Sequence, residues 1–170
     1  MTTLEPKTGL RPSVLLNLAA PCSEPAATET QTLTQAVQSA VRAVDESALR
    51  PVARQDAGVA FQPRALLAIM SYCYARQIYS SSDIEGVMMR DEYFRQLCGN
   101  EFPGARVFRR FRRENREALH SCLKAGLKLM AENKARETIA AAPSEADLSE
   151  EASRRIIKAM FIDSMRLEDE

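Results

Sequence analysis

The stretch Pro63-Arg-Ala-Leu-Leu-Ala-Ile-Met-Ser-Tyr-Cys-Tyr-Ala-Arg-Gln-Ile78 decides the fold, because it places apolar or aromatic side chains nearly all round one predicted helix. Pro63 suits the first turn of that helix, whose φ it fixes in advance. A helix without a polar face belongs in the middle of a core. The chain has only six glycines and no runs of Val, Ile and Thr with period two, so we predict an all-α fold.

Shorter amphipathic patterns surround this central helix on both sides. Before it, residues 32–49 carry an apolar stripe that ends at Pro51. After it, Ser80–Asp83 offer N-caps for a short helix, and residues 91–97 predict another that stops at Cys98-Gly99-Asn100. A long helix is expected over residues 104–133. The last helix is expected from about Ser149, with one apolar side made of Ile156, Ile157, Met160, Phe161 and Met165.

These patterns predict about five to six helices in one small domain with extensions. Residues 1–28 hold four of the eight prolines, which favours a flexible N-terminal arm. Residues 29–134 form the predicted helical domain. Residues 135–170 form an acidic linker and an extra C-terminal amphipathic helix.

The formal net charge is zero, but the charges are unevenly distributed. Residues 61–134 carry thirteen basic and eight acidic side chains, whereas residues 135–170 carry five basic and nine acidic ones. A polyanion responds to the local field rather than to the average charge. The basic middle of the chain therefore predicts an anionic partner.

An arginine-rich segment, residues 104–119, concentrates that charge. At about 100° per residue, its apolar side chains and most of its arginines fall on opposite sides of a helix, with Arg112 on the border between them. Arginine can grip a phosphate or a guanine edge with two hydrogen bonds. Together with the short helix before it, the segment has the lengths of a helix-turn-helix unit. The candidate DNA-binding residues are Arg106, Arg109, Arg110, Arg112, Arg113 and Arg116.

A salt-bridged, solvated helix face is the simpler interpretation of such a cluster. Arg110 with Glu114, and Arg113 with Glu117, have the i,i+4 spacing of intrahelical ion pairs. Two glutamates cannot balance six arginines, however. The surplus favours an anion outside the helix.

No catalytic, metal or cofactor site is expected. The four cysteines lack CxxC spacing and are predicted to be reduced thiols, two or three of them packed in a core. His120 and Cys122 are two residues apart, which places them on different helix faces and excludes joint metal ligation. The carboxylates are scattered, without a His, Lys or glycine-rich turn to make an acid–base site. No apolar run approaches the roughly 20 residues of a membrane span.

Residues 58–130 resemble the N-terminal domain of bacterial insertion-sequence transposases of the InsH type, which belong to the DDE class. The elements that carry the resemblance are Gly58, Phe61-x-Pro63-Arg64-x-Leu66-Leu67, Tyr72, Tyr74, Ser80-Ser81, Ile84-Glu85, Asp91, Phe94, Leu97, Gly99, Pro103 and Phe108-Arg109-Arg110-Phe111-Arg112. The family usually begins its last helix with an Asp-His-Ser or Asp-His-Thr cap, whereas this chain has Gly104-Ala105-Arg106. The C-terminal helix has no counterpart in the family pattern.

The resemblance implies that this domain binds DNA and that a separate ribonuclease-H-like domain would supply three metal-binding acidic residues. Only about forty residues follow the resembling region and they predict helix, so we expect no enzymatic activity and no cofactor. The expected function is binding of duplex DNA at insertion-sequence ends, as a non-catalytic subunit or regulator of transposition, in the bacterial cytoplasm with the nucleoid. A separate catalytic transposase subunit and a homodimer through residues 149–167 are the expected protein partners. The alternative is a protein-interaction or dimerisation module whose arginines meet an acidic surface, including the chain's own residues 145–170.

Overall fold

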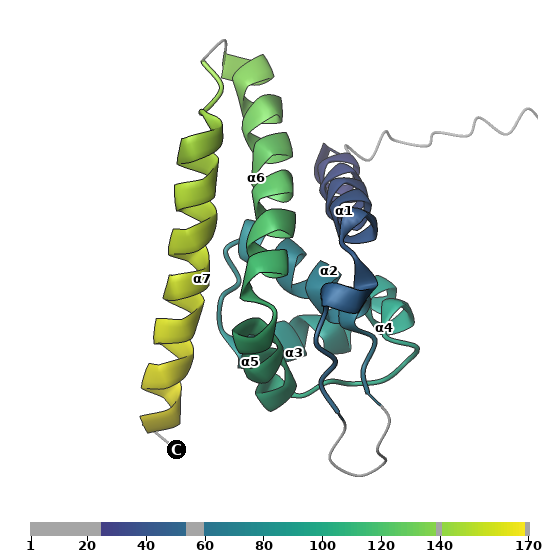
Figure 1. Cartoon of the computed structure of the whole chain (residues 1–170). Coiled ribbons are helices and arrows are strands. Elements are labelled where there is room, and N and C mark those ends of the chain that lie inside the picture. Colours follow the sequence, from purple (N-terminus) through teal and green to yellow (C-terminus); the bar gives the residue numbers. More distant parts are fainter. Residues whose placement is uncertain (1–24, 54–59, 139–140, 169–170) are drawn as a thin grey trace, which may run out of the picture.

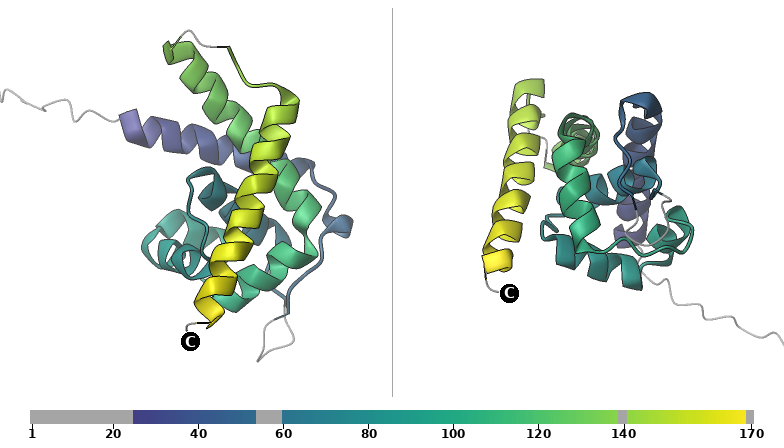
Figure 2. Two further views of the ribbon diagram at one scale, coloured as in Figure 1. Left: turned by 90° about the vertical axis from the view of Figure 1, so that its left-hand side faces the viewer. Right: turned by 60° about the horizontal axis from the view of Figure 1, so that its bottom comes forward.

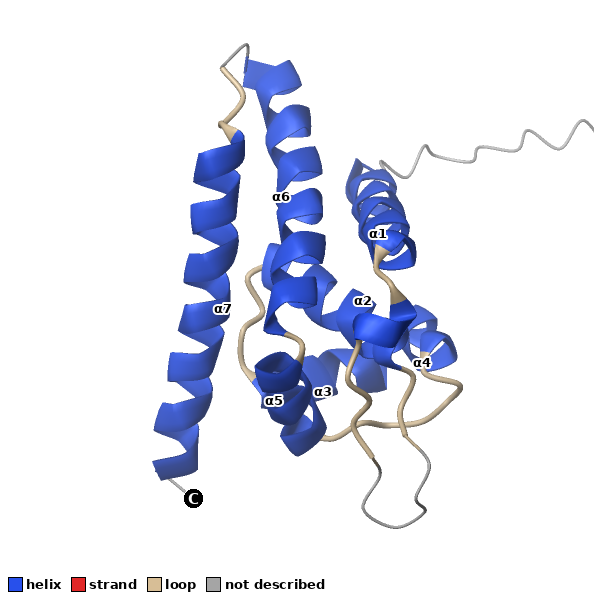
Figure 3. Cartoon of the chain, viewed as in Figure 1, coloured by secondary structure: helices blue, strands red, loops and turns tan. Residues whose placement is uncertain are grey.

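A computed structural model describes residues 25–53, 60–138 and 141–168 (Figure 1). The described residues form α-helices and one short 3-10 turn, with no strand among them (Figure 3). The all-α prediction is confirmed. The helices are α1 (Pro25–Ala43), α2 (Pro63–Ala75), α3 (Ser81–Arg90), α4 (Glu92–Leu97), α5 (Ala105–Glu114), α6 (Arg116–Thr138) and α7 (Glu145–Glu168).

Helix α2 lies at the centre of the molecule, as its pattern predicts. Every residue from Ala65 to Ala75 is buried, and Pro63 occupies the first turn. Helices α1 and α6 pack against α2, and α3 and α5 contact it from below in the view of Figure 1. A helix that is apolar nearly all round thus forms the centre of the core, and the other helices pack against it.

Helices α1 and α6 pack closely at Gly126. The α1 side chains Leu33, Val37 and Val41 are buried, which confirms the predicted apolar stripe. A Cβ atom at Gly126 would lie 3.3 Å from both Leu33 Cδ1 and Val37 Cγ2. Glycine therefore lets the backbone of α6 approach α1.

Helix α1 begins inside the predicted flexible arm. It starts at Pro25, so residues 25–28 are helical rather than flexible. Pro25 stands at the first helical position, where proline loses no hydrogen bond. The rest of the predicted arm, residues 1–24, lies outside the described residues.

The predicted long helix over residues 104–133 is two helices, and this raises the number of α-helices in the described part of the chain to seven. The break falls at Asn115, which is buried between α5 and α6. Its side chain donates to the carbonyl of Phe111 at 3.2 Å and also reaches the backbone of Arg50. These polar contacts stabilise a bend at Asn115. The periodicity of the apolar residues continues across this position, so it does not predict the bend.

Helix α7 begins at Glu145, four residues before the predicted start. Ser144 and Asp147 form a capping box there: the Asp147 carboxylate accepts from the Ser144 N–H and hydroxyl, and Ser144 Oγ accepts from the Asp147 N–H. The Ser-x-x-Asp spacing directly after Pro143 indicates a helix start at this position. Helix α7 packs against α6 on the outside of the molecule: it runs beside α6 in Figure 1 and crosses it at an angle in the left view of Figure 2.

The predicted apolar side of α7 is divided between interior and surface. Of its five members only Ile156 is buried, next to Leu148, Ala152 and Ala159. The other four members, Ile157, Met160, Phe161 and Met165, are among the exposed large apolar side chains of the described chain. The prediction of one apolar face is therefore wrong, because Leu148, Ala152, Ile156 and Ala159 form the buried face, while the other four members remain on the surface.

Candidate nucleic-acid interface

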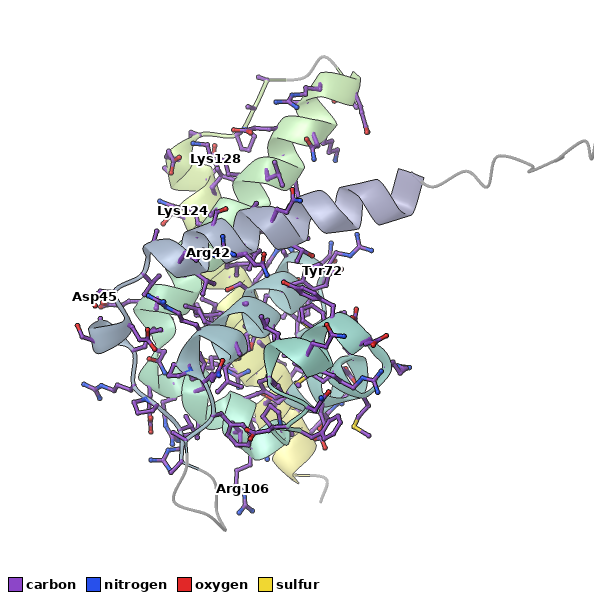
Figure 4. The ribbon with its side chains drawn as sticks, turned by 90° about the vertical axis from the view of Figure 1, so that its right-hand side faces the viewer. Arg42, Asp45, Tyr72, Arg106, Lys124 and Lys128 are labelled. Carbon is purple, nitrogen blue, oxygen red and sulfur yellow. The ribbon has the colours of Figure 1, made fainter. Side chains whose placement is uncertain are left out.

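Helix α5 separates apolar and basic side chains as predicted. Phe108 and Phe111 are fully buried, whereas Arg106, Arg110 and Arg113 are exposed and Arg109 is half-buried. Figure 4 shows Arg106 pointing away from the body of the molecule at its lower edge. The buried phenylalanines fix the rotation of the helix, and that rotation turns four arginines outward.

Glu85 caps the start of this helix. Gly104 is the N-cap residue and has no side chain to offer, but Glu85 Oε2 on α3 accepts the Ala105 N–H at 3.0 Å. A carboxylate at a helix N-terminus also meets the positive end of the helix dipole. A residue from another helix thus replaces the local Asp cap that the resembling transposases carry.

The basic surface continues past the bend at Asn115. Arg116 opens α6 and is exposed. Asn115 Oδ1 accepts the Arg50 N–H at 2.7 Å, and Asn115 Nδ2 donates to the Arg50 carbonyl at 3.0 Å. This pair of bonds holds the backbone of exposed Arg50 next to Asn115, the residue that precedes Arg116. No sequence pattern predicts that Arg50 belongs to this basic surface, because Arg50 precedes Asn115 by 65 residues.

Few acidic groups compensate this surface. Arg110 Nε pairs with Glu114 at 2.8 Å, as its spacing predicts. The predicted pair of Arg113 with Glu117 is not among the ion pairs of the described residues. Of the six arginines predicted to contact DNA, four form no salt bridge with a described residue: Arg106, Arg109, Arg113 and Arg116. We call these four, together with Arg110 and Arg50, the arginine surface.

Arg112 does not belong to the arginine surface, which corrects its place among the predicted DNA contacts. Its side chain is 5% exposed and its guanidinium lies 2.7 Å from Asp163 Oδ2 on α7. Around the helix axis Arg112 stands roughly 40° from Phe108 and roughly 60° from Arg109, so its position alone allows either environment. The ion pair with the buried carboxylate of Asp163 holds the Arg112 side chain in the interior.

A closed polar network surrounds Asp163. Besides Arg112, it accepts the Ser81 N–H at 2.8 Å and the Ser81 hydroxyl at 2.6 Å. Arg112 also donates to the Tyr74 hydroxyl at 2.7 Å. Buried charges are tolerated where a partner and further hydrogen bonds satisfy them. The network joins α2, α3, α5 and α7 through one carboxylate.

The protonation states of this network follow from its surroundings. Burial raises the pKa of Tyr74 to about 12, so its hydroxyl is neutral at physiological pH. Burial alone would lower the pKa of Arg112, but attraction to Tyr74 and hydrogen bonds to Tyr74 and Asp163 outweigh it and raise that pKa. Arg112 therefore stays charged, and Asp163 is its ionic partner.

The acidic C-terminal segment contacts few arginines of α5. Glu145 pairs with Lys124 and Lys128 on α6, and its pKa is lowered, chiefly by hydrogen bonds from these two lysines. Glu151 pairs with Arg154 and Arg155 within α7 itself. Among the described acidic residues of α7, only Asp163 reaches an arginine of α5, and that arginine is Arg112. The arginine surface remains open to a partner.

Thiols and histidine add no reactive group to this surface. Cys73, Cys98 and Cys122 are free and buried, as predicted, while Cys22 lies outside the described residues. Burial raises the pKa of Cys73 and of Cys122 to about 12. His120 Nε2 bonds the Ser149 carbonyl at 2.9 Å, which ties α6 to α7. The described ranges contain no cluster of three His, Cys, Asp or Glu suited to a metal ion.

The predicted helix-turn-helix unit stays a prediction. Seven residues, 98–104, separate α4 from α5, and α5 packs mainly against α3. Helix α4 ends as predicted, with Gly99 and Asn100 at positive φ.

None of the described helices has both the length and the hydropathy of a membrane-crossing segment.

Comparison with models of protein families identifies a match for this chain. The family model described as "Transposase domain (DUF772)" matches residues 28–114, which is half of the chain. No curated protein and no solved structure matches. The match starts 30 residues before the region that carries the sequence resemblance and ends with α5, so it includes α1 and the arginine helix and leaves α6 and α7 outside. This chain belongs to the DUF772 transposase-domain family.

Proposed function

We propose that this protein binds duplex DNA through its arginine surface as the DNA-binding component of a transposition system. The observation that carries the proposal is the open basic surface at the junction of α5 and α6, where four arginines form no salt bridge within the described residues. Membership of a transposase-domain family makes DNA the preferred polyanion.

The chemistry of arginine suits this role. Guanidinium groups contact phosphate oxygens through forked hydrogen bonds, and arginine pairs with guanine edges in the major groove. Helix α5 presents its arginines on a rigid scaffold, because Phe108, Phe111 and buried Arg112 hold it from the other side. A rigid basic helix loses little conformational freedom on binding.

The proposed targets are insertion-sequence ends, and the proposed role is that of a non-catalytic subunit or regulator. In this arrangement a separate catalytic transposase subunit would supply strand cleavage, and the protein would reside with the nucleoid. The competing function is recognition of an acidic protein surface by the same arginines. Both functions need the arginine surface, so the ligand decides between them.

Fluorescence anisotropy tests the proposal directly. The probes are a labelled duplex with the terminal inverted repeats of the element and a labelled duplex of scrambled sequence. The triple variant Arg109→Gln, Arg113→Gln, Arg116→Gln should bind both about tenfold or more weakly, because three phosphate contacts are lost. A preference of the wild type for the terminal repeats would identify the ends as targets.

A matched control removes three exposed arginines elsewhere: Arg42→Gln, Arg76→Gln, Arg136→Gln. Figure 4 places Arg42 on α1, well away from Arg106. The control has the same net charge as the test variant and should keep most of the affinity. Equal losses in both variants would refute a localised interface. Wild-type binding to poly-glutamate that matches its binding to DNA would instead support the acidic-protein alternative.

A further inference from the structure

Helix α7 has a second apolar face that points away from the molecule. The side chains on this face are 54% exposed at Ile157, 42% at Met160, 63% at Phe161 and 49% at Met165. At about 100° per residue they fall within an arc of roughly 140°, opposite the buried face of Ala152, Ile156 and Ala159. We call these four residues the outer stripe. Scattered single apolar residues are ordinary on a surface, but a continuous helical stripe marks an interaction site.

The intervals between the residues along this face are symmetric about its central residue. Arg154, Ile157, Phe161, Met165 and Glu168 follow one another at intervals of three, four, four and three residues, with Phe161 at the centre. All five positions share the same arc of the helix, and Glu168 is its last residue. The order of chemical types is basic, apolar, aromatic, apolar, acidic.

We propose that a second copy of this chain covers the outer stripe, with the two α7 helices antiparallel about a two-fold axis at Phe161. In this register Phe161 meets its own counterpart, Ile157 meets Met165, and position 154 meets position 168. Such an interface is isologous, so every contact occurs twice.

Charge selects the antiparallel arrangement over a parallel one. A parallel pair would place Arg154 beside Arg154, and like charges at an interface disfavour association. Arg154 is 67% exposed despite its contacts with Glu150 and Glu151, so its guanidinium is accessible to a partner. The exposed charge of Arg154 therefore favours a reversed copy of the helix, in which the two Arg154 side chains lie at opposite ends of the stripe.

The size of the stripe indicates a dimer that dissociates on dilution. Four half-exposed apolar side chains offer on the order of 400 Å² per subunit, which is below the area of stable protein interfaces and fits a weak, transient dimer. The inference goes beyond DNA binding and does not depend on it. Because α7 presents this face on the outside of the molecule (Figures 1 and 2), pairing needs no rearrangement of the core.

Sedimentation equilibrium of the full chain across a dilution series tests the pairing without DNA. We expect the wild type to approach twice the monomer mass at high concentration. Phe161→Glu should remain monomeric, because it places two carboxylates face to face on the axis, and Phe161→Lys should as well. An equimolar mixture of the two variants should associate again, since only a residue on the two-fold axis faces itself. Met89→Glu, at a site 57% exposed on α3, is the control that should still dimerise.

Disulfide trapping in a Cys22→Ser background gives an independent readout of register. Phe161→Cys should crosslink with itself under mild oxidation. Ile157→Cys and Met165→Cys should crosslink with each other in a mixture far more than either does alone. A wild type that stays monomeric throughout the series, or a Phe161→Glu variant that dimerises like the wild type, would overturn the proposal. Self-crosslinking of Ile157→Cys alone would overturn the antiparallel register.

Discussion

The Asp163 carboxylate on α7 lies 2.7 Å from the Arg112 guanidinium on α5, and both side chains are about 5% exposed or less. The two residues come from opposite sides of the boundary at which the transposase-family match ends. The helix outside the match therefore completes the core beneath the arginine helix. Helix α7 is a structural part of this protein and not an appendage.

Removal of the acidic partner should cost much more than removal of both partners. Asp163→Asn leaves a buried guanidinium without its counter-charge, and we expect a loss of about 3–5 kcal/mol in the free energy of unfolding. The double variant Arg112→Met, Asp163→Leu should recover most of that loss, because an apolar pair replaces the ion pair. Urea denaturation of the single and double variants measures the coupling. Additive losses would show that the two side chains stabilise the fold independently.

Arg112 also shows where sequence patterns stop being informative. The central helix and the inward turn of Phe108 and Phe111 follow from periodicity alone, because burial of large apolar side chains dominates folding. Arg112 sits on the border of the two faces, and its orientation depends on a carboxylate 51 residues later. Arg50 joins the arginine surface through Asn115, a contact that is equally remote in sequence. Polar contacts of this kind have no local signal.

The start of α7 could have been predicted more closely. Pro143 and the Ser144-x-x-Asp147 spacing form a recognisable capping box. The division of the α7 apolar residues was harder to foresee, because Ala152 and Ala159 give no strong periodic signal. They share the buried face with Leu148 and Ile156, while Ile157, Met160, Phe161 and Met165 remain outside.

Asn115 should prove important for the junction of α5 and α6. Asn115→Ala removes one acceptor and one donor for the Arg50 backbone and a bond to Phe111. We expect a loss of about 1–3 kcal/mol, since the part-buried N–H and carbonyl of Arg50 are left without these partners. Asn115→Asp keeps the acceptor for the Arg50 N–H and should lose less. Hydrogen exchange at the Arg50 amide reports the effect locally, and unchanged protection in Asn115→Ala would contradict it.

Alkaline pH should destabilise the fold through its buried thiols and phenol. Folding raises the pKa of Cys73 and Cys122 from 9.0 to about 12, and that of Tyr74 from 10.0 to about 12. The unfolded chain therefore releases these protons at lower pH than the folded one. Their contribution is complete below about pH 9 and declines as pH rises toward 12. Urea midpoints measured across this window should fall, and less steeply for Cys73→Ala, Cys122→Ala. A flat profile would contradict the burial of these groups.

The capping box should stabilise α7 by a modest amount. Ser144→Ala should reduce the free energy of unfolding by about 1 kcal/mol, because the Asp147 N–H loses its acceptor. Ser153→Ala makes the same substitution in the middle of α7 and should have little effect. Hydrogen bonds from Ser144 lower the pKa of Asp147, so the contribution of this carboxylate is present above about pH 3.9 and disappears as pH falls further. Equal thermal shifts for both alanine variants would argue against the cap.

The ion pair of Arg110 with Glu114 predicts a substitution that strengthens DNA binding. Glu114 holds the Arg110 side chain within the helix and brings a negative charge to the arginine surface. Glu114→Gln should increase affinity for duplex DNA severalfold and steepen its decline with salt, by up to about one unit of the logarithmic slope, because one more arginine becomes available to a phosphate. Arg113→Gln should reduce that slope by about one unit, whereas Arg110→Gln should reduce it less, because Glu114 already neutralises part of its charge. Glu150→Gln, on the outer side of α7, changes the net charge equally and is the control. Anisotropy titrations at about 50 and 200 mM salt supply the slopes. If Glu150→Gln strengthened binding as much as Glu114→Gln, the gain would come from net charge and not from release of Arg110.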